Sequence, residues 1–162
     1  MALRAETLTM TARTDQAEIT ALVDRFFLAL DTREFTPGWA RPYLTDDASM
    51  AAPVGSTRGA EAVRTAETAL LRFAGTQHFA SGVVTDAAFG TDHATASWNA
   101  YMVHIHHSPA PDPLFVVGGR WEATLRRTAE GWRFTTMAVH VVWTRGEPPT
   151  PETETETETE TG

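Results

Sequence analysis

Residues Thr91–His107 read TDHATASWNAYMVHIHH, the stretch around which the rest of the chain can be interpreted. Its side chains alternate with the two-residue period of a β-strand, so they form two distinct faces. One face is small and apolar and ends in a histidine: Ala94, Ala96, Trp98, Ala100, Met102 and His104. Because alanines leave volume unfilled on an inward face, this pattern predicts a space that large side chains or a ligand fills. His104 is either a buried histidine with a backbone partner or a functional group at that space.

The opposite face of the same stretch becomes apolar towards its end. Tyr101, Val103 and Ile105 form it, and Leu114 and Val116 extend it on the next predicted strand. Large apolar patches are rarely left bare on soluble proteins. We therefore expect a homo-oligomer, a dimer or a trimer, that covers this face.

Helical patterns precede this strand. Apolar side chains recur at helical spacing from Ile19 to Leu30, and Asp15 with Glu18 fits a capping box that starts the helix at Asp15. Asp31 follows at the edge of the apolar stripe, near the helix end. Further patterns predict a short helix over residues 37–44, a short strand over 48–54 and a second long helix over 60–73.

The second half of the chain is strand-like. Strands are predicted over residues 77–85, 94–107, 114–127 and 132–143, with turn residues between them and a bend or bulge at Gly118 and Gly119. Helices first and a long antiparallel meander afterwards indicate an α+β fold. We expect a curved antiparallel sheet wrapped around N-terminal helices, forming a cone with an internal pocket.

Composition excludes several functions. The chain has 162 residues, enough for one domain, and no cysteine, which excludes disulfides, a thiol nucleophile and thiolate metal sites. No apolar run approaches the roughly 18 residues of a membrane span, and the start lacks the apolar core of a secretory signal, so we expect a cytoplasmic protein. No basic patch is present for nucleic acid, and no cationic helix for a membrane surface.

The formal net charge of −8 is concentrated at the C-terminal end. Five glutamates lie beyond residue 150, so that removing them leaves −3 for residues 1–150. The segment PPTPETETETETETG has no apolar content to offset the entropy of ordering it. The sequence therefore predicts a flexible arm over residues 1–14, one domain over 15–147 and a disordered Thr/Glu tail over 148–162.

Several segments, in their order and spacing, resemble the SnoaL-like family of the nuclear transport factor and ketosteroid isomerase superfamily: ALDTRE, YLTDDASM, STRGAEAVR, TQHFASG, ATASWNAYMVH and GRWEATLRRTAEGWRF. The resemblance covers residues 15–143. It implies an α+β cone whose helices close a deep apolar pocket. The superfamily contains dehydratases, cyclases, isomerases and epoxide hydrolases, together with subunits and carriers that catalyse nothing.

The pattern is nearest to that of the scytalone dehydratases. There, a helix aspartate orients a strand histidine that acts as general acid and base, and a second histidine follows the third helix. The resemblance assigns these places to Asp31, His104 and His78. The chain departs from the pattern at Leu30, which replaces a tyrosine, and at Gly119 and Trp121, which replace a serine and an asparagine, so the substrate-reading groups differ.

These residues indicate a cofactor-independent lyase or isomerase. We expect a dehydratase or cyclase for an apolar, oxygenated small molecule such as a polyketide-type metabolite, with His104 as acid and base, Asp31 as its orienter and His78 as an electrophilic aid. His78 could instead be a structural histidine that caps the turn before its strand. Two other functions fit the same fold: a non-catalytic ligand-binding or assembly subunit, and an epoxide-opening hydrolase or cyclase, which needs a second acid beside Asp31.

We expect the pocket wall to be apolar and to consist of Phe26, Leu30, Trp98, Ala100, Met102, Gly119, Trp121, Met137, Val139 and Val141. A metal site is not expected, because His104, His106 and His107 are close neighbours on one strand and cannot all point the same way. His140 alternates with the inward Val139 and Val141, which places it on the outer face, at a subunit contact.

Overall fold

The computed structural model describes residues 2–52, 55–87, 91–107 and 112–149, and for residues 2–13 it describes the backbone alone. From Thr150 onward, the predicted tail lies outside the described residues. Within the described part of the chain, no helix combines the length and the apolar character that crossing a membrane requires.

Two helices and six strands follow one another along the described residues: α1 (Ala2–Thr32), β1 (Leu44–Ala52), β2 (Gly55–Arg58), α2 (Ala60–Leu71), β3 (Gly75–Ala87), β4 (His93–Ile105), β5 (Leu114–Thr128) and β6 (Gly131–Arg145). The strands form one sheet in the order β2-β1-β6-β5-β4-β3. Neighbouring strands are antiparallel, except that β6 runs parallel to β1. The predicted α+β order is confirmed.

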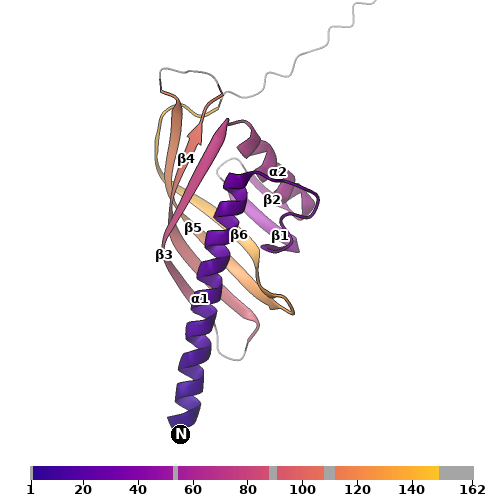
Figure 1. Cartoon of the computed structure of the whole chain (residues 1–162), viewed down its shortest axis with the longest axis vertical. Coiled ribbons are helices and arrows are strands. Elements are labelled where there is room, and N and C mark those ends of the chain that lie inside the picture. The colour runs from indigo at the N-terminus through magenta and orange to yellow at the C-terminus, as the bar shows by residue number, and fades with distance from the viewer. Residues whose placement is uncertain (1, 53–54, 88–90, 108–111, 150–162) are drawn as a thin grey trace, which may run out of the picture.

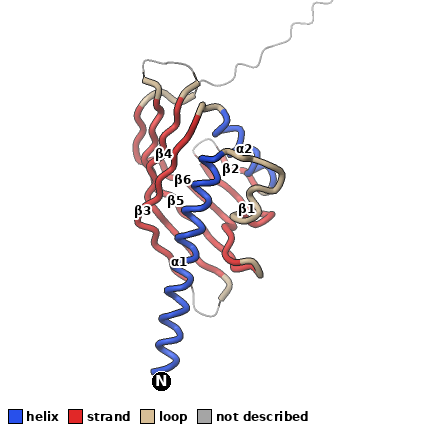
Figure 2. Tube along the Cα trace, viewed as in Figure 1, coloured by secondary structure: helices blue, strands red, loops and turns tan. Residues whose placement is uncertain are grey.

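The sheet is curved, and the helices occupy its hollow side. Helix α1 runs along the hollow beside β3, and α2 lies against β1 and β2 (Figure 1, Figure 2). The predicted cone of a curved sheet around helices is therefore confirmed. The sheet does not close, so β3 remains an edge strand on which α1 packs.

The core lies where the apolar stripe of α1 meets β4 and β5. Phe27 makes edge-on ring contacts with Trp98 and Trp121, at centroid distances of 6.1 Å and 5.7 Å. The two tryptophan rings stack at 6.0 Å. All six residues of the predicted inward face of β4 are buried, which confirms the alternation. Each large apolar side chain buried here contributes about 1.5–3 kcal/mol.

Helix α1 begins earlier than the sequence pattern suggested. Its bounds place residues 2–14, predicted as a loose arm, in the helix, and its N-terminal turns extend past the sheet (Figure 1). The predicted N-cap role of Asp15 is therefore wrong. Asp15 is buried inside the helix, where its Oδ1 accepts hydrogen bonds from Arg127 and from the indole of Trp132. Because the Asp15 carboxylate bonds side chains of β5 and β6, it does not cap the backbone N–H groups at the start of the helix.

The short helix predicted over residues 37–44 is also wrong. Turns occupy residues 37–43, and β1 begins at Leu44. Gly38 has a φ of 84°, a left-handed conformation that interrupts a helix. The backbone instead makes successive short-range hydrogen bonds, from Trp39 to Thr36, from Arg41 to Gly38 and from Tyr43 to Ala40.

The predicted irregularity at Gly118 and Gly119 is confirmed, because the pairing of β5 with β6 shifts register between them. The ring of Trp143 lies over Gly118 so closely that a Cβ there would be 2.2 Å from it. Any side chain at this position would therefore displace the tryptophan ring.

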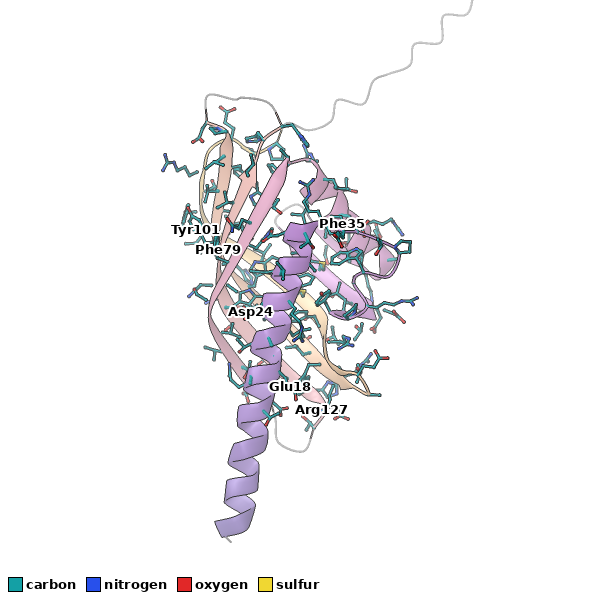
Figure 3. The ribbon with its side chains drawn as sticks, in the orientation of Figure 1. Glu18, Asp24, Phe35, Phe79, Tyr101 and Arg127 are labelled. Carbon is teal, nitrogen blue, oxygen red and sulfur yellow. The ribbon has the colours of Figure 1, made fainter. Side chains whose placement is uncertain are left out.

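On the outer face of the sheet, aromatic side chains are half exposed. Phe79 and Tyr101 lie together at a centroid distance of 6.2 Å (Figure 3), and Tyr101 contacts Trp143 at 5.9 Å. The predicted patch was partly misplaced, because Val116 is buried. The exposed apolar patch comprises Phe79, Tyr101 and Trp143, which ring contacts join, together with Ile105 and Val142, which are exposed on the same strands as Tyr101 and Trp143.

Candidate active site

Asp31 and His78 form a close polar pair on the hollow side of the sheet. The Nδ1 atom of His78 lies 2.6 Å from Oδ1 of Asp31, and the backbone N–H of His78 donates to Oδ2 at 2.8 Å. The hydroxyl of Thr76 also donates to Oδ1, at 3.0 Å. Because an ionised carboxylate can only accept hydrogen bonds, Nδ1 of His78 must donate and therefore carries a hydrogen. The other ring nitrogen, Nε2, does not bond to Asp31.

The fold explains why these groups meet. Asp31 belongs to the last turn of α1, at the edge of its apolar stripe, and that turn packs against the start of β3. Thr76 and His78 are two residues apart on β3 and share its inner face. Because β3 is an edge strand, an N–H group on its free side needs a partner other than a strand, and the Asp31 carboxylate supplies it for His78.

Arg33 holds the helix end in this position. Its φ of 59° is left-handed, which costs a residue other than glycine about 1 kcal/mol or more. Its guanidinium donates to the carbonyl of Ala74 at 2.7 Å, one residue before β3 begins. This bond ties the end of α1 to the strand that carries His78.

His104 lies beside this pair but does not bond to it. Its Nδ1 is 3.1 Å from the carbonyl oxygen of Phe115, to which it donates, and its ring meets that of His78 edge-on at 5.7 Å. Phe73 packs against the same ring at 4.7 Å. Burial lowers the pKa of His104 to about 4, because water is excluded from the charged form and the Phe115 bond only partly compensates. His104 is therefore neutral at pH 7.

The predicted pairing of Asp31 with His104 is wrong. Asp31 bonds His78, and His104 has the backbone partner that was the alternative for it. His78 is likewise no cap of the preceding turn, because it lies inside β3. The three residues nevertheless lie together: Asp31 bonds His78, and the ring of His78 contacts that of His104.

Both histidines face a cavity of about 330 Å³ between α2 and the inner face of the sheet. This volume is at the lower end of the range for small-molecule sites, ~300–1,000 Å³. The His78 side chain is only 3% exposed and His104 only 9%, so they lie at the closed end. The exposed residues of the wall are Ala52, Gly55, Thr65, Ala69 and Val141, which places the opening between α2 and the ends of β1, β2 and β6.

A sequence model of the SnoaL-like domain matches residues 11–138, most of this chain. The chain belongs to the SnoaL-like domain family. No curated protein matches this SnoaL-like chain in sequence.

Solved structures share the fold of this SnoaL-like domain at low sequence identity. A candidate scytalone dehydratase from Novosphingobium aromaticivorans is 19% identical, with a TM-score of 0.74 over 89% of this chain and 97% of that one. A protein of the nuclear transport factor 2-like superfamily from Salmonella enterica is 16% identical, with a TM-score of 0.68 over 90% and 98%. The type 3 hexachlorocyclohexane dehydrochlorinase of Novosphingobium barchaimii is 14% identical, with a TM-score of 0.68 over 86% and 92%.

Half of the predicted pocket residues line the cavity of the SnoaL-like domain: Leu30, Met102, Trp121, Val139 and Val141. The others do not. Phe26, Trp98 and Met137 are almost completely buried in the core below it. Ala100 and Gly119 are register partners on β4 and β5 with little or no side chain, and they are not part of the wall.

Sequence patterns did not identify several wall residues on β1, β2, α2 and β5: Met50, Thr57, Ala66, Ala69, Phe115 and Val117. The alanines of α2 carried a usable signal, because an apolar helix face of small residues matches the small inward face of β4. Met50 and Thr57 had none, because β1 pairs with the distant β6 and β2 pairs with β1, and tertiary structure decides the pairing with β6.

His140 lies on the outer face, as predicted, and its Nε2 is 3.3 Å from a Glu122 carboxylate oxygen.

Proposed function

We propose that this protein is a cofactor-independent lyase or isomerase in which His78, held by Asp31, moves a proton on a small apolar molecule bound in the cavity. The observation that carries the proposal is the 2.6 Å contact between Nδ1 of His78 and Asp31 at the closed end of an apolar cavity. A carboxylate at Nδ1 fixes the tautomer of an imidazole and stabilises the imidazolium that forms when Nε2 accepts a proton.

The chemistry that this arrangement supports is elimination or enolisation. Nε2 of His78 takes a proton from a carbon next to an electron-withdrawing group, and the C–H electron pair becomes a carbon–carbon double bond as the leaving group departs. In a dehydration, the His78 imidazolium returns the proton to the departing hydroxyl, which leaves as water. Proton transfer by one positioned group contributes about 10²–10⁴ in rate.

His104 is a poor candidate for the acid. With its pKa lowered to about 4, it has no proton to give from Nε2 at pH 7. The proposal therefore moves the acid and base role from His104 to His78 and keeps Asp31 as the orienting group.

The comparisons support this reaction class without specifying a substrate. Two of the similar structures are named as a scytalone dehydratase candidate and a dehydrochlorinase, and both names denote elimination reactions. An oxygenated apolar molecule of the polyketide type fits a cavity of this size and polarity.

The test uses 5-nitrobenzisoxazole, an apolar bicyclic compound. Loss of its C–H proton to a base forms a nitrile as the N–O bond breaks, and the phenolate product is coloured. We expect the wild-type protein to exceed His78→Ala by about a hundredfold or more. His140→Ala, on the outer face, is the control and keeps the wild-type rate. Equal rates for wild type and His78→Ala contradict the proposal.

A non-catalytic ligand-binding subunit is the second candidate. The observation in its favour is that Asp31 does not itself line the cavity. Such a protein binds bicyclic compounds but gives equal rates for wild type and His78→Ala in the elimination test. Epoxide opening is less well supported, because no carboxylate lines the cavity within the described residues.

We propose that the outer face mediates self-association as a dimer or trimer. The patch of Phe79, Tyr101, Ile105, Val142 and Trp143 supports this, since contiguous apolar patches commonly mark interfaces. The most exposed member is Val142, at 73%. Val142→Lys should lower the mass measured by light scattering to that of a monomer, whereas Leu28→Lys on α1 should not. A monomeric wild-type protein contradicts the assignment.

A further inference from the structure

We propose that this cavity selects an uncharged ligand whose hydroxyl group donates a hydrogen bond to Nε2 of His104. The inference rests on the proposed function only for the placement of the substrate in this cavity. It assigns a role to the second histidine, which the proton transfer at His78 does not use.

The tautomer of His104 follows from its partner. A carbonyl oxygen can only accept, so the contact of Nδ1 with the Phe115 carbonyl at 3.1 Å places a hydrogen on Nδ1. Nε2 then carries a lone pair. Among the described residues no protein group bonds to this nitrogen, and the ring is part of the cavity wall. His104 therefore presents an acceptor to whatever occupies the closed end.

The rest of the closed end offers little else that is polar. His78 has its Nδ1 bound to Asp31 and lines the cavity beside His104. The indole N–H of Trp121 has essentially no exposed surface, although its ring lines the cavity. The wall also contains two hydroxyl groups, on half-buried Thr57 and on exposed Thr65.

Charge narrows the ligand class further. No arginine, lysine or carboxylate lines the cavity within the described ranges. A carboxylate or phosphate ligand would be buried against the lone pair of His104 without an arginine or lysine to offset its desolvation. A hydroxyl hydrogen, in contrast, satisfies the lone pair of His104. The chemistry of the wall therefore points to a neutral alcohol, phenol or enol.

The test compares bicyclic probes that fit an apolar cavity: 2-naphthol, which donates a hydrogen bond, 2-methoxynaphthalene, which cannot, and 2-naphthoate, which is an anion at pH 7.5. Dissociation constants are measured by quenching of tryptophan fluorescence. We expect the preference for 2-naphthol over 2-methoxynaphthalene to fall about tenfold in His104→Phe relative to wild type, because one buried hydrogen bond is lost. The comparison between variants cancels the difference in hydrophobicity of the two probes. 2-Naphthoate should bind the wild-type protein at least tenfold more weakly than 2-naphthol.

Two further variants separate this inference from the proposed function. His78→Ala should keep the preference for 2-naphthol even though it loses the elimination activity. His140→Phe on the outer face should keep both. A preference that is unchanged in His104→Phe, or tight binding of 2-naphthoate, overturns the inference.

A measurement on the wild-type protein covers the case in which His104→Phe does not fold. In ¹⁵N NMR of the imidazole groups, Nε2 of His104 should appear unprotonated at pH 7.5 and should shift towards hydrogen-bonded values when 2-naphthol is added. A protonated Nε2 in the free protein, or no shift with bound 2-naphthol, overturns the inference.

Discussion

Nδ1 of His78 lies 2.6 Å from Oδ1 of Asp31, and the same carboxyl group accepts the backbone N–H of His78 at 2.8 Å. One carboxylate thus fixes both the strand position and the ring orientation of the histidine. Thr76 adds a third bond to it. This arrangement leaves Nε2 of His78 as the free nitrogen at the closed end of the cavity.

Replacing Asp31 by asparagine should reduce the elimination rate of 5-nitrobenzisoxazole about tenfold to a thousandfold. The amide can still occupy the site, but it no longer stabilises an imidazolium and can hold the wrong tautomer of His78. The rate constant kcat is the measurement. Asp24→Asn, an exposed position on the same helix (Figure 3), is the matched control and should leave kcat unchanged. An Asp31→Asn protein with wild-type kcat would show that His78 works without its carboxylate.

His104 should make stability depend on pH in a defined window. Its pKa is lowered in the folded protein to about 4 from an ordinary value of 6.5. Between these values the unfolded chain binds more protons, so the free energy of unfolding decreases as the pH falls from 6.5 towards 4 and is unaffected above that range. The decrease is on the order of 2–3 kcal/mol.

Urea unfolding at pH 7 and pH 5 measures this dependence. His104→Phe should have a shallower pH dependence than the wild-type protein, whatever its absolute stability. His140→Gln on the outer face should retain the wild-type slope. An equal slope in His104→Phe contradicts a lowered pKa at this histidine.

Arg127 should stabilise the fold through buried Asp15. Arg127 donates to Asp15 Oδ1 and lies 4.4 Å over the ring of Trp132, at the end of the sheet where α1 crosses (Figure 3). Arg127→Met removes the charge that compensates a buried carboxylate. Because Arg127 is about one third exposed, we expect a loss of about 1–3 kcal/mol rather than the full cost of a buried pair.

The neighbouring arginine provides the control for this change. Arg126 lies on the opposite face of β5 and reaches exposed Asp47 only at 3.9 Å. Arg126→Met should change the free energy of unfolding by less than about 0.5 kcal/mol. Similar losses for both variants would mean that Asp15 does not depend on Arg127.

Filling the cavity from α2 should block binding without unfolding the protein. Ala66 lines the cavity, so Ala66→Leu places three further carbon atoms in space that the ligand needs. We expect 2-naphthol to bind at least tenfold more weakly, with an unchanged or higher Tm. Thr68→Leu, at an exposed position of the same helix, is the control and should bind normally. Unchanged binding by Ala66→Leu would place the ligand elsewhere.

The strands of this chain could be recognised from sequence, because burial of one sheet face makes apolar and polar residues alternate within each strand. Every second residue of β4 faces the core, so the alternation from Ala94 to His104 reports the inward face directly. Helix α1 was recognisable from its apolar stripe for the same reason. The start of this helix could not be recognised, because aspartate is a common N-cap residue, whereas Asp15 bonds side chains of β5 and β6 instead.

Periodicity and segment order depend on local burial, so they were enough to predict the α+β cone and the inward face of β4. The three residues that converge on the site came from the family resemblance. Tertiary structure alone decided which histidine Asp31 holds. Asp31 is 47 residues from His78 along the chain, and no local spacing relates the two. Their pairing arises because the last turn of α1 packs on β3, an edge strand, where the backbone N–H of His78 donates to the Asp31 carboxylate. His104 lies on the neighbouring strand β4 and donates to the Phe115 carbonyl.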